Sequence, residues 1–181
     1  MGAILTQNTA WTNVERALGA LKREGRMSLD ALREIPEPLL AGLIRPSGYY
    51  NQKARKVKAF IAFLDERFGG SLRRMACAEK TDLREQLLQI HGIGPETADC
   101  ILLYAANKTV FVVDAYTRRV FARHGLCAAD VSYEALQRRI EEGVARDLYL
   151  YQQYHALLVQ VGKDYCRKEP RCQGCPLEAL L

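Results

Sequence analysis

The stretch His91-Gly92-Ile93-Gly94-Pro95-Glu96-Thr97-Ala98-Asp99, followed by the apolar run Val110-Phe111-Val112-Val113 and Asp114, decides the fold. Gly92 and Gly94 predict a tight turn with positive φ, and Pro95 suits the first position of a helix. Thr81 is the expected cap of the helix before the turn. The free N–H groups at the start of the second helix favour an anion such as a phosphate.

At these residues the chain resembles the helix-hairpin-helix DNA glycosylases of the endonuclease III superfamily. In that family an aspartate in a Val-Asp context follows the hairpin, and here Asp114 lies twenty positions after Gly94 (114 minus 94). The resemblance extends from Leu5-Thr6-Gln7 to the terminal cysteines and is greatest to the 3-methyladenine glycosylase branch. It implies that Asp114 is the catalytic carboxylate. It also implies DNA contacts by the hairpin residues Gly92, Ile93, Gly94 and Thr97.

Composition is that of a globular protein, and its positive charge is compatible with a polyanionic partner. Of the 181 residues, 49% are hydrophobic and 26% charged, enough for one sizeable core or two small lobes. The net charge is +5, which is compatible with DNA but does not identify it. No apolar run is long enough for a membrane span and no signal peptide is visible, so we expect a cytoplasmic, nucleoid-associated prokaryotic monomer without a membrane partner.

The segments on either side of the hairpin supply further candidates for the DNA site. By resemblance, Gln7 enters the gap that a flipped base leaves. Because aromatic side chains stack on extruded bases, Trp11 and either Tyr49 or Tyr50 are candidates for a base pocket. Each also has an ordinary alternative, a helix-end amide or core aromatics. We expect Lys53 and Arg118 to contact phosphate, although a basic cluster around Lys53 is equally typical of a solvated helix face.

The position of Glu96 separates two reaction types. Bifunctional relatives carry a lysine two residues after the second glycine, where its amine forms a Schiff base with the sugar. A carboxylate cannot form an imine, so the sequence predicts a monofunctional enzyme in which Asp114 stabilises the cationic sugar and orients a water. A base alkylated at N3 or N7 leaves readily and suits an aromatic pocket, which indicates an alkylated substrate base.

The helical periodicity and the near absence of strand-like alternation predict an all-α fold. By resemblance we expect two helical lobes with a DNA-binding cleft between them. One lobe comprises residues 12–110 and contains the helix-hairpin-helix motif, and the other comprises residues 1–11 plus 111–181. Asp114 is expected at the junction, where it begins a helix, and an ordinary N-cap is the alternative for that residue.

Three cysteines close the chain, Cys166, Cys172 and Cys175. Thiolates at such spacing bind zinc or an iron–sulfur cluster. The resemblance implies a [4Fe-4S] cluster, but the family's fourth cysteine position is Leu181 here. A cluster with another fourth ligand, a cluster completed beyond residue 181, a zinc ion and an empty site all remain open. Likewise, the sequence does not decide whether its short N-terminus is native or truncated.

Three other functions compete with the monofunctional glycosylase. An endonuclease III-type glycosylase and lyase would act on oxidised pyrimidines, against which Glu96 argues. A non-catalytic module that senses DNA damage would need the hairpin, but it would not account for the presence of Asp114. A cysteine-rich metal-binding interaction protein would explain the terminus but neither the hairpin nor Asp114. Double-stranded DNA with a damaged base is therefore the expected partner.

Overall fold

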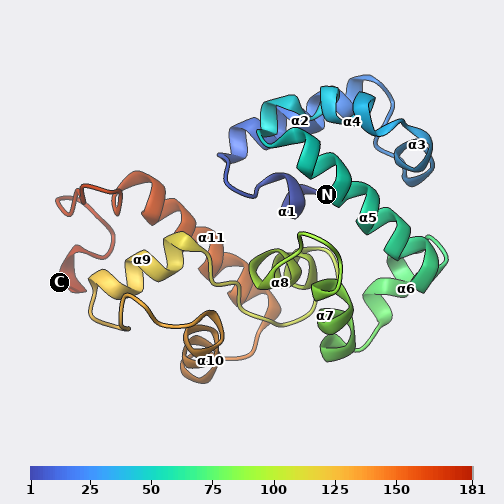
Figure 1. Ribbon diagram of the computed structural model, residues 1–181. Helices are drawn as coiled ribbons and strands as arrows, with labels where there is room; N and C mark the ends of the chain where they lie inside the picture. Colours follow the sequence, from blue (N-terminus) through green and yellow to red (C-terminus); the bar gives the residue numbers. More distant parts are fainter. Residues whose placement is uncertain (181) are drawn as a thin grey trace. The chain divides into compact units, whose positions relative to one another are not determined.

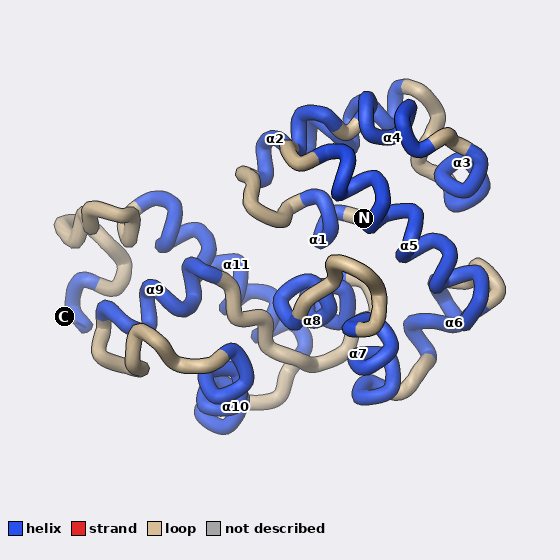
Figure 2. Tube along the Cα trace, viewed as in Figure 1, coloured by secondary structure: helices blue, strands red, loops and turns tan. Residues whose placement is uncertain are grey.

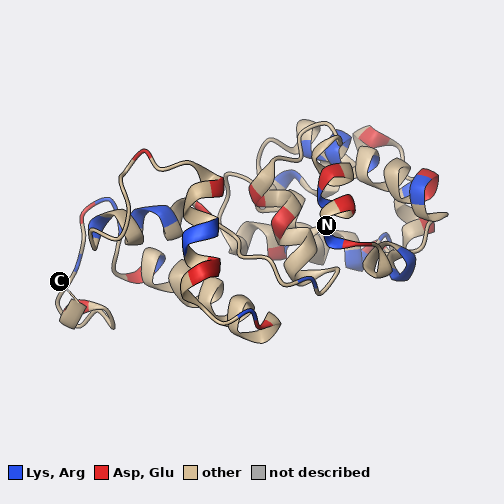
Figure 3. Ribbon diagram, turned by 90° about the horizontal axis from the view of Figure 1, so that it is seen from below, with Lys and Arg blue, Asp and Glu red and all other residues tan. Residues whose placement is uncertain are grey.

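The computed structural model describes residues 1–180, which form helices joined by loops and contain no strand (Figures 1 and 2). The expected all-α fold is confirmed. Two compact units divide the chain, Met1–Ile101 and Leu102 onward. None of the helices in residues 1–180 is sufficiently long and apolar to cross a membrane. Basic and acidic residues occur on helices of both units (Figure 3).

The first unit contains the chain up to and into α8. Its elements are α1 (Gly2–Leu5), α2 (Trp11–Arg23), α3 (Leu29–Glu34), α4 (Glu37–Leu43), η1 (Arg45–Ser47), α5 (Tyr50–Phe68), α6 (Leu72–Cys77), α7 (Lys80–Leu88) and the greater part of α8 (Pro95–Tyr104).

The long helix α5 lies at the centre of the first unit. It buries Ala54, Val57, Ile61 and Leu64 at helical spacing, and α4 packs along it. Gly69 ends α5 in a left-handed conformation with φ of 56°, where its N–H bonds the Asp65 carbonyl. That is the usual way in which a glycine closes a helix.

The second unit contains α9 (Ala115–Arg123), α10 (Tyr133–Gly143), α11 (Leu148–Asp164) and η2 (Glu178–Leu180). The apolar run Val110–Val113 is buried and forms an extended link outside any helix. Because it has no strand partner, side chains of α10 satisfy its backbone: Gln137 Nε2 donates to the Phe111 carbonyl at 2.6 Å and Glu141 accepts from the Phe111 N–H at 2.8 Å. These bonds fix the direction in which the chain enters Asp114.

Two details differ from the sequence predictions. The structure groups residues 1–11 with the first unit, whereas we expected them to join the residues after 110. The reason is local bonding: the Leu5 carbonyl accepts from Lys53 on α5, and Gln7 bonds the hairpin. In addition, Thr81 lies within α7, and Glu79 caps that helix by accepting from the N–H groups of Thr81 and Asp82.

Candidate active site and DNA interface

The hairpin between α7 and α8 is formed by one strained glycine and one open glycine. Gly92 has φ of +80°, a conformation that favours glycine, and a Cβ there would press against the Lys56 side chain. Gly94 does not have the positive φ that we expected; its carbonyl instead accepts the N–H of Ala98 at 2.9 Å to start α8. Nothing lies within 4 Å of a Cβ added at Gly94, so this position is open to an approaching ligand.

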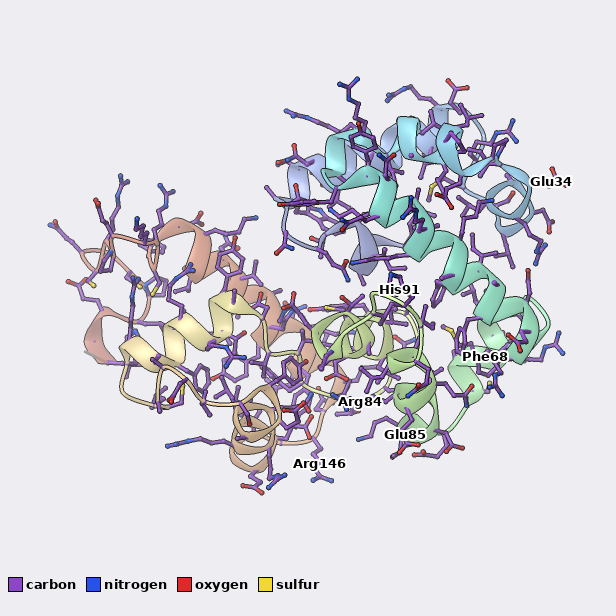
Figure 4. The ribbon with its side chains drawn as sticks, viewed as in Figure 1. Glu34, Phe68, Arg84, Glu85, His91 and Arg146 are labelled. Carbon is purple, nitrogen blue, oxygen red and sulfur yellow. The ribbon has the colours of Figure 1, made fainter. Side chains whose placement is uncertain are left out.

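The two remaining hairpin candidates are buried. The side chain of Ile93 is 4% exposed and its N–H bonds the Ile90 carbonyl, so Ile93 anchors the turn from inside. Thr97, in the first turn of α8, is 6% exposed. His91 is exposed in the loop between α7 and α8, where Figure 4 labels it. A contact between the hairpin and DNA phosphate would therefore use the backbone at Gly94 and the start of α8.

Gln7 is bonded into the hairpin from the N-terminal segment. Its Nε2 donates to the Gly92 carbonyl at 3.1 Å and to Thr97 Oγ1 at 2.8 Å. Its Oε1 accepts from Lys56 Nζ at 2.5 Å. Both ends of the amide are thus engaged, and Lys56 of α5 is brought beside the hairpin, a residue that the sequence reasoning did not select. The available signal was its membership of the basic cluster around Lys53.

A buried ion pair holds α7 and α8 together. Arg84 of α7 donates to both carboxylate oxygens of Asp99 on α8, at 2.7 and 3.1 Å, and Asp99 is fully buried. Bidentate arginine–carboxylate pairs fix the relative orientation of their two parent elements. The pair therefore sets the angle between the two helices of the hairpin, and Figure 4 labels Arg84 on α7.

Lys53 is buried and therefore inaccessible to a DNA phosphate. Its side chain is 1% exposed, and its ammonium donates to the carbonyls of Leu5 at 2.8 Å and Ser47 at 2.6 Å. Burial, with a smaller effect from the nearby charge of Lys56, lowers the pKa of Lys53 to about 8. Lys53 thus joins α1, η1 and α5, and its burial argues against the phosphate contact expected from the sequence.

The three aromatic candidates all belong to the first unit. Trp11 is 47% exposed at the first position of α2, and Tyr49 is 65% exposed directly before α5. Tyr49 has φ of 45°, a left-handed conformation that costs a non-glycine residue free energy and often accompanies function. Tyr50 is half-buried. No contact among the three rings is present in the described chain, so a shared base pocket stays a prediction.

Asp114 caps α9 and faces a histidine. Its Oδ1 accepts from the Thr117 N–H at 2.7 Å, as predicted for an N-cap, and its Oδ2 lies 3.6 Å from Nε2 of His155 on α11. Burial acts to raise the pKa of Asp114, but His155 and the Thr117 N–H outweigh it, so the pKa falls below its usual value. Asp114 is therefore an ionised, largely buried carboxylate whose Oδ1 faces the Thr117 N–H and whose Oδ2 faces His155 Nε2 at 3.6 Å.

His155 was absent from the sequence-based candidates. It is 41 positions from Asp114, and a single histidine on an apolar helix gives no signal by itself. By contrast, Arg118 was a candidate, and its guanidinium bonds the Val131 carbonyl within the second unit. Arg118 is half-buried, so its proposed phosphate contact depends on the part of the group that this bond leaves accessible.

The three terminal cysteines line one cavity of about 250 Å³ in the second unit. Arg123 lies over the Cys166 sulfur, with Nη1 at 3.3 Å, and the Leu177 N–H points to the Cys175 sulfur at 3.5 Å. Hydrogen-bond donors directed at sulfur commonly accompany cysteines that ligate a metal or cluster. The cavity is also lined by His124 and Glu178, whose imidazole and carboxylate groups are able to coordinate metals.

The cysteine cavity has the residue type that an iron–sulfur cluster requires, but its sulfurs are not close enough together to bind one. Among residues 1–180, no three His, Cys, Asp or Glu side chains come together closely enough to hold a metal ion. Cys166 is buried, Cys175 half-buried and Cys172 exposed. The sulfurs would have to converge on the cavity for Cys166, Cys172 and Cys175 to ligate one group.

A glycine hairpin whose helix start is open to an anion suits a phosphate of the DNA backbone, and an ionised carboxylate that caps a helix is a group suited to stabilising positive charge. A family model described as "HhH-GPD superfamily base excision DNA repair protein" matches residues 1–146. A putative DNA repair glycosylase of Methanocaldococcus jannaschii is 44% identical over 180 residues, which cover 98% of this chain and 81% of that protein.

Solved structures agree with the sequence matches. H. pylori 3-methyladenine DNA glycosylase, bound to 1,N6-ethenoadenine, has a TM-score of 0.80 at 32% identity over 90% of this chain and 82% of that one. Endonuclease III in a non-covalent DNA complex has a TM-score of 0.82 at 23% identity over 99% and 79%, which shows the shared fold. The chain therefore belongs to the HhH-GPD superfamily, as a DNA glycosylase of base excision repair.

Proposed function

We propose that this glycosylase is monofunctional, that it removes an alkylated base, and that Asp114 is its catalytic residue. The observation that carries the first part is Glu96, an exposed carboxylate at the hairpin position where bifunctional relatives have lysine. The 32% identity to a 3-methyladenine glycosylase supports the second part. The ionised state of Asp114 supports the third, because an anion is needed opposite the developing sugar cation.

The proposed reaction begins with extrusion of the damaged nucleotide from the duplex. The backbone at Gly94 and the start of α8 would hold the phosphate, and Gln7 would leave its hairpin bonds to fill the gap in the stack. The exposed rings of Trp11 and Tyr49 would contact the flipped base, whose positive charge suits their π faces. Loss of the base leaves an oxocarbenium-like sugar beside Asp114 Oδ2. Water then adds to the anomeric carbon and gives its proton to the Asp114 carboxylate, which passes it to solvent, leaving an abasic site.

An endonuclease III-type lyase remains the second candidate, because endonuclease III of Thermotoga maritima is 28% identical over 98% of this chain and 78% of that protein. Such an enzyme needs an accessible amine. Lys53 does not fit that need, since it is buried and bonded to two carbonyls. Lys56 is the lysine nearest the hairpin, and its amine bonds Gln7.

The deciding experiment incubates the protein with duplexes that carry 3-methyladenine, 7-methylguanine or thymine glycol. We expect base release from an alkylated duplex, with strand breaks only after alkali. Borohydride during turnover should trap no covalent adduct. A trapped adduct that maps to Lys56, and is lost in Lys56→Arg but not in the control Lys58→Arg, would establish the lyase instead. Release of thymine glycol alone would contradict the alkylated substrate.

We further propose that the cysteine cavity holds an iron–sulfur cluster with Cys166, Cys172 and Cys175 among its ligands. The cluster would order the loop that carries Arg167, Lys168 and Arg171 for contact with DNA, since hydrolysis of the glycosidic bond needs no redox step. Protein purified without oxygen should be brown and contain iron. Cys172→Ser should lose that iron, whereas Cys77→Ser, which changes an exposed cysteine of the first unit, should keep it. Zinc or no metal in the wild-type protein would contradict a cluster.

A further inference from the structure

Asp114 is the first member of a chain of three polar side chains within the second unit. His155 Nε2 lies 3.6 Å from Asp114 Oδ2, and His155 Nδ1 lies 2.7 Å from the Tyr104 hydroxyl. The side chains of Asp114 and His155 are each only 12% exposed. The three come from the N-cap of α9, the middle of α11 and the last residue of α8, and nothing in the family resemblance assigns the histidine or the tyrosine a role.

The distances favour one arrangement of the protons. The Tyr104 hydroxyl lies 2.7 Å from His155 Nδ1 and 3.3 Å from the Gln152 carbonyl. With the hydroxyl proton in the shorter contact, Nδ1 is an acceptor. A neutral imidazole then carries its own proton on Nε2, which is the atom that faces the ionised Asp114. Tyr104 thus selects the tautomer that offers a donor to the carboxylate.

An ordinary core histidine would have both ring nitrogens satisfied. Here Nε2 is buried and, within residues 1–180, has no partner at hydrogen-bond distance. At 3.6 Å, the Asp114 carboxylate is too far for a full hydrogen bond but near enough for attraction. Buried polar atoms are rarely left in that state without a purpose. The arrangement orients Oδ2 while leaving it available for the reaction.

We propose that His155 and Tyr104 are positioning residues for catalysis. Tyr104 fixes the His155 tautomer, and the Nε2–H of His155 holds Asp114 in its anionic form with Oδ2 directed to the sugar. This inference rests on the proposed catalytic role of Asp114. The groups that face the carboxylate are the Thr117 N–H from α9, the His155 imidazole from α11 and, through it, the Tyr104 hydroxyl from α8.

The physical consequence is a shift in the pH dependence of base release. Burial alone raises the pKa of Asp114, and His155 is the largest of the influences that lower it. Removing the imidazole therefore leaves a desolvated carboxylate that takes up a proton at higher pH. Activity should then be lost earlier on acidification. A residue that merely filled space would change stability without moving this profile.

The test measures single-turnover base release against pH, with enzyme in excess over an alkylated duplex. His155→Phe should lower the rate about tenfold or more, as when an orienting partner of a functional side chain is removed, and should shift the acid limb to higher pH. His155→Gln restores an N–H donor and should recover much of both. Tyr104→Phe should show a smaller shift in the same direction, and Tyr149→Phe, which changes an exposed tyrosine on α11, should behave as wild type.

The outcomes separate this inference from the proposed function. If Asp114→Asn is inactive while His155→Phe and Tyr104→Phe keep the wild-type rate and profile, the positioning role is refuted and the catalytic role of Asp114 stands. If Asp114→Asn itself turns over normally, the catalytic role fails first. Should His155→Phe not fold, the profiles of His155→Gln and Tyr104→Phe decide, since a wild-type acid limb in Tyr104→Phe overturns the tautomer assignment.

Discussion

Asp114→Asn should separate catalysis from folding, because the two carboxylate oxygens have different tasks. Oδ1 caps α9 through the Thr117 N–H at 2.7 Å, and an asparagine carbonyl can accept the same bond. Asparagine and aspartate are equally good caps, so the capping bond itself should change the free energy of unfolding by only a few tenths of a kcal/mol, and any larger change comes from loss of the charge that faces His155. Asp114→Ala removes the cap and should cost about 1 kcal/mol, or about 2–4 °C in Tm for a chain of this size.

The loss of activity should be far larger than the loss of stability. Removing one preorganised electrostatic group from an active site typically lowers the rate by about 10²–10³, or about 3–4 kcal/mol of transition-state stabilisation. Asp147→Asn is the matched control, because Asp147 caps α11 through the Leu150 N–H at 2.7 Å and has no proposed role in catalysis. Single-turnover base release and thermal unfolding of the variants make the comparison. Turnover by Asp114→Asn equal to that of Asp147→Asn would refute the assignment.

Three further predictions follow from the surroundings of the site. Gly94→Ala should leave Tm nearly unchanged, since its Cβ meets no atom, but should weaken binding to lesion-free duplex DNA measured by anisotropy, whereas Gly92→Ala should lower Tm because of its φ and the Lys56 contact. In the wild type, the free energy of unfolding should rise between about pH 8 and 10.5, because in this range the unfolded state holds a proton on Lys53 that the folded state has lost. The two pKa values limit this rise to about 3 kcal/mol. Denaturant titrations of Lys53→Met should show no such rise. Because the folded-state pKa of Asp114 is lowered, its stabilising contribution is present above the unfolded pKa and lost as the pH falls through the folded value, so the stability difference between wild type and Asp114→Asn should shrink on acidification.

Local features of the fold could be predicted from the sequence because their signals are local. The apolar spacing of α5, the proline start of α8, the extended Val110–Val113 link and the cap at Asp114 all depend on residues within a few positions of one another. The assignment of Lys53 depended on distant partners instead. Its ammonium bonds a carbonyl 48 positions away, and no periodicity in the sequence records such a bond.

The candidate site shows the same division. The hairpin and Asp114 were found by their mutual spacing, but Gln7 bonds a residue 90 positions away and His155 meets Asp114 only through the packing of α9 with α11. Exposure in the structure supports Trp11 and Tyr49 as accessible rings, which sequence alone could not distinguish from core aromatics. Their role in base binding stays a prediction.

Buried polar side chains in this chain fall into two kinds, those whose polar atoms have hydrogen-bond partners and those with some hydrogen bonds left unmade. The ammonium of Lys53 donates to two carbonyls, and the carboxylate of Asp99 accepts from Nε and Nη2 of Arg84. These bonds give both groups a structural role. Around Asp114 the bonding is incomplete. Thr117 Oγ1 and His155 Nε2 are both buried without a hydrogen-bond partner among residues 1–180. An unpaired buried polar atom costs about 1–3 kcal/mol. A third such atom in residues 1–180 is the Tyr151 hydroxyl, but the other two belong to residues that contact Asp114, and this supports the catalytic role proposed for it.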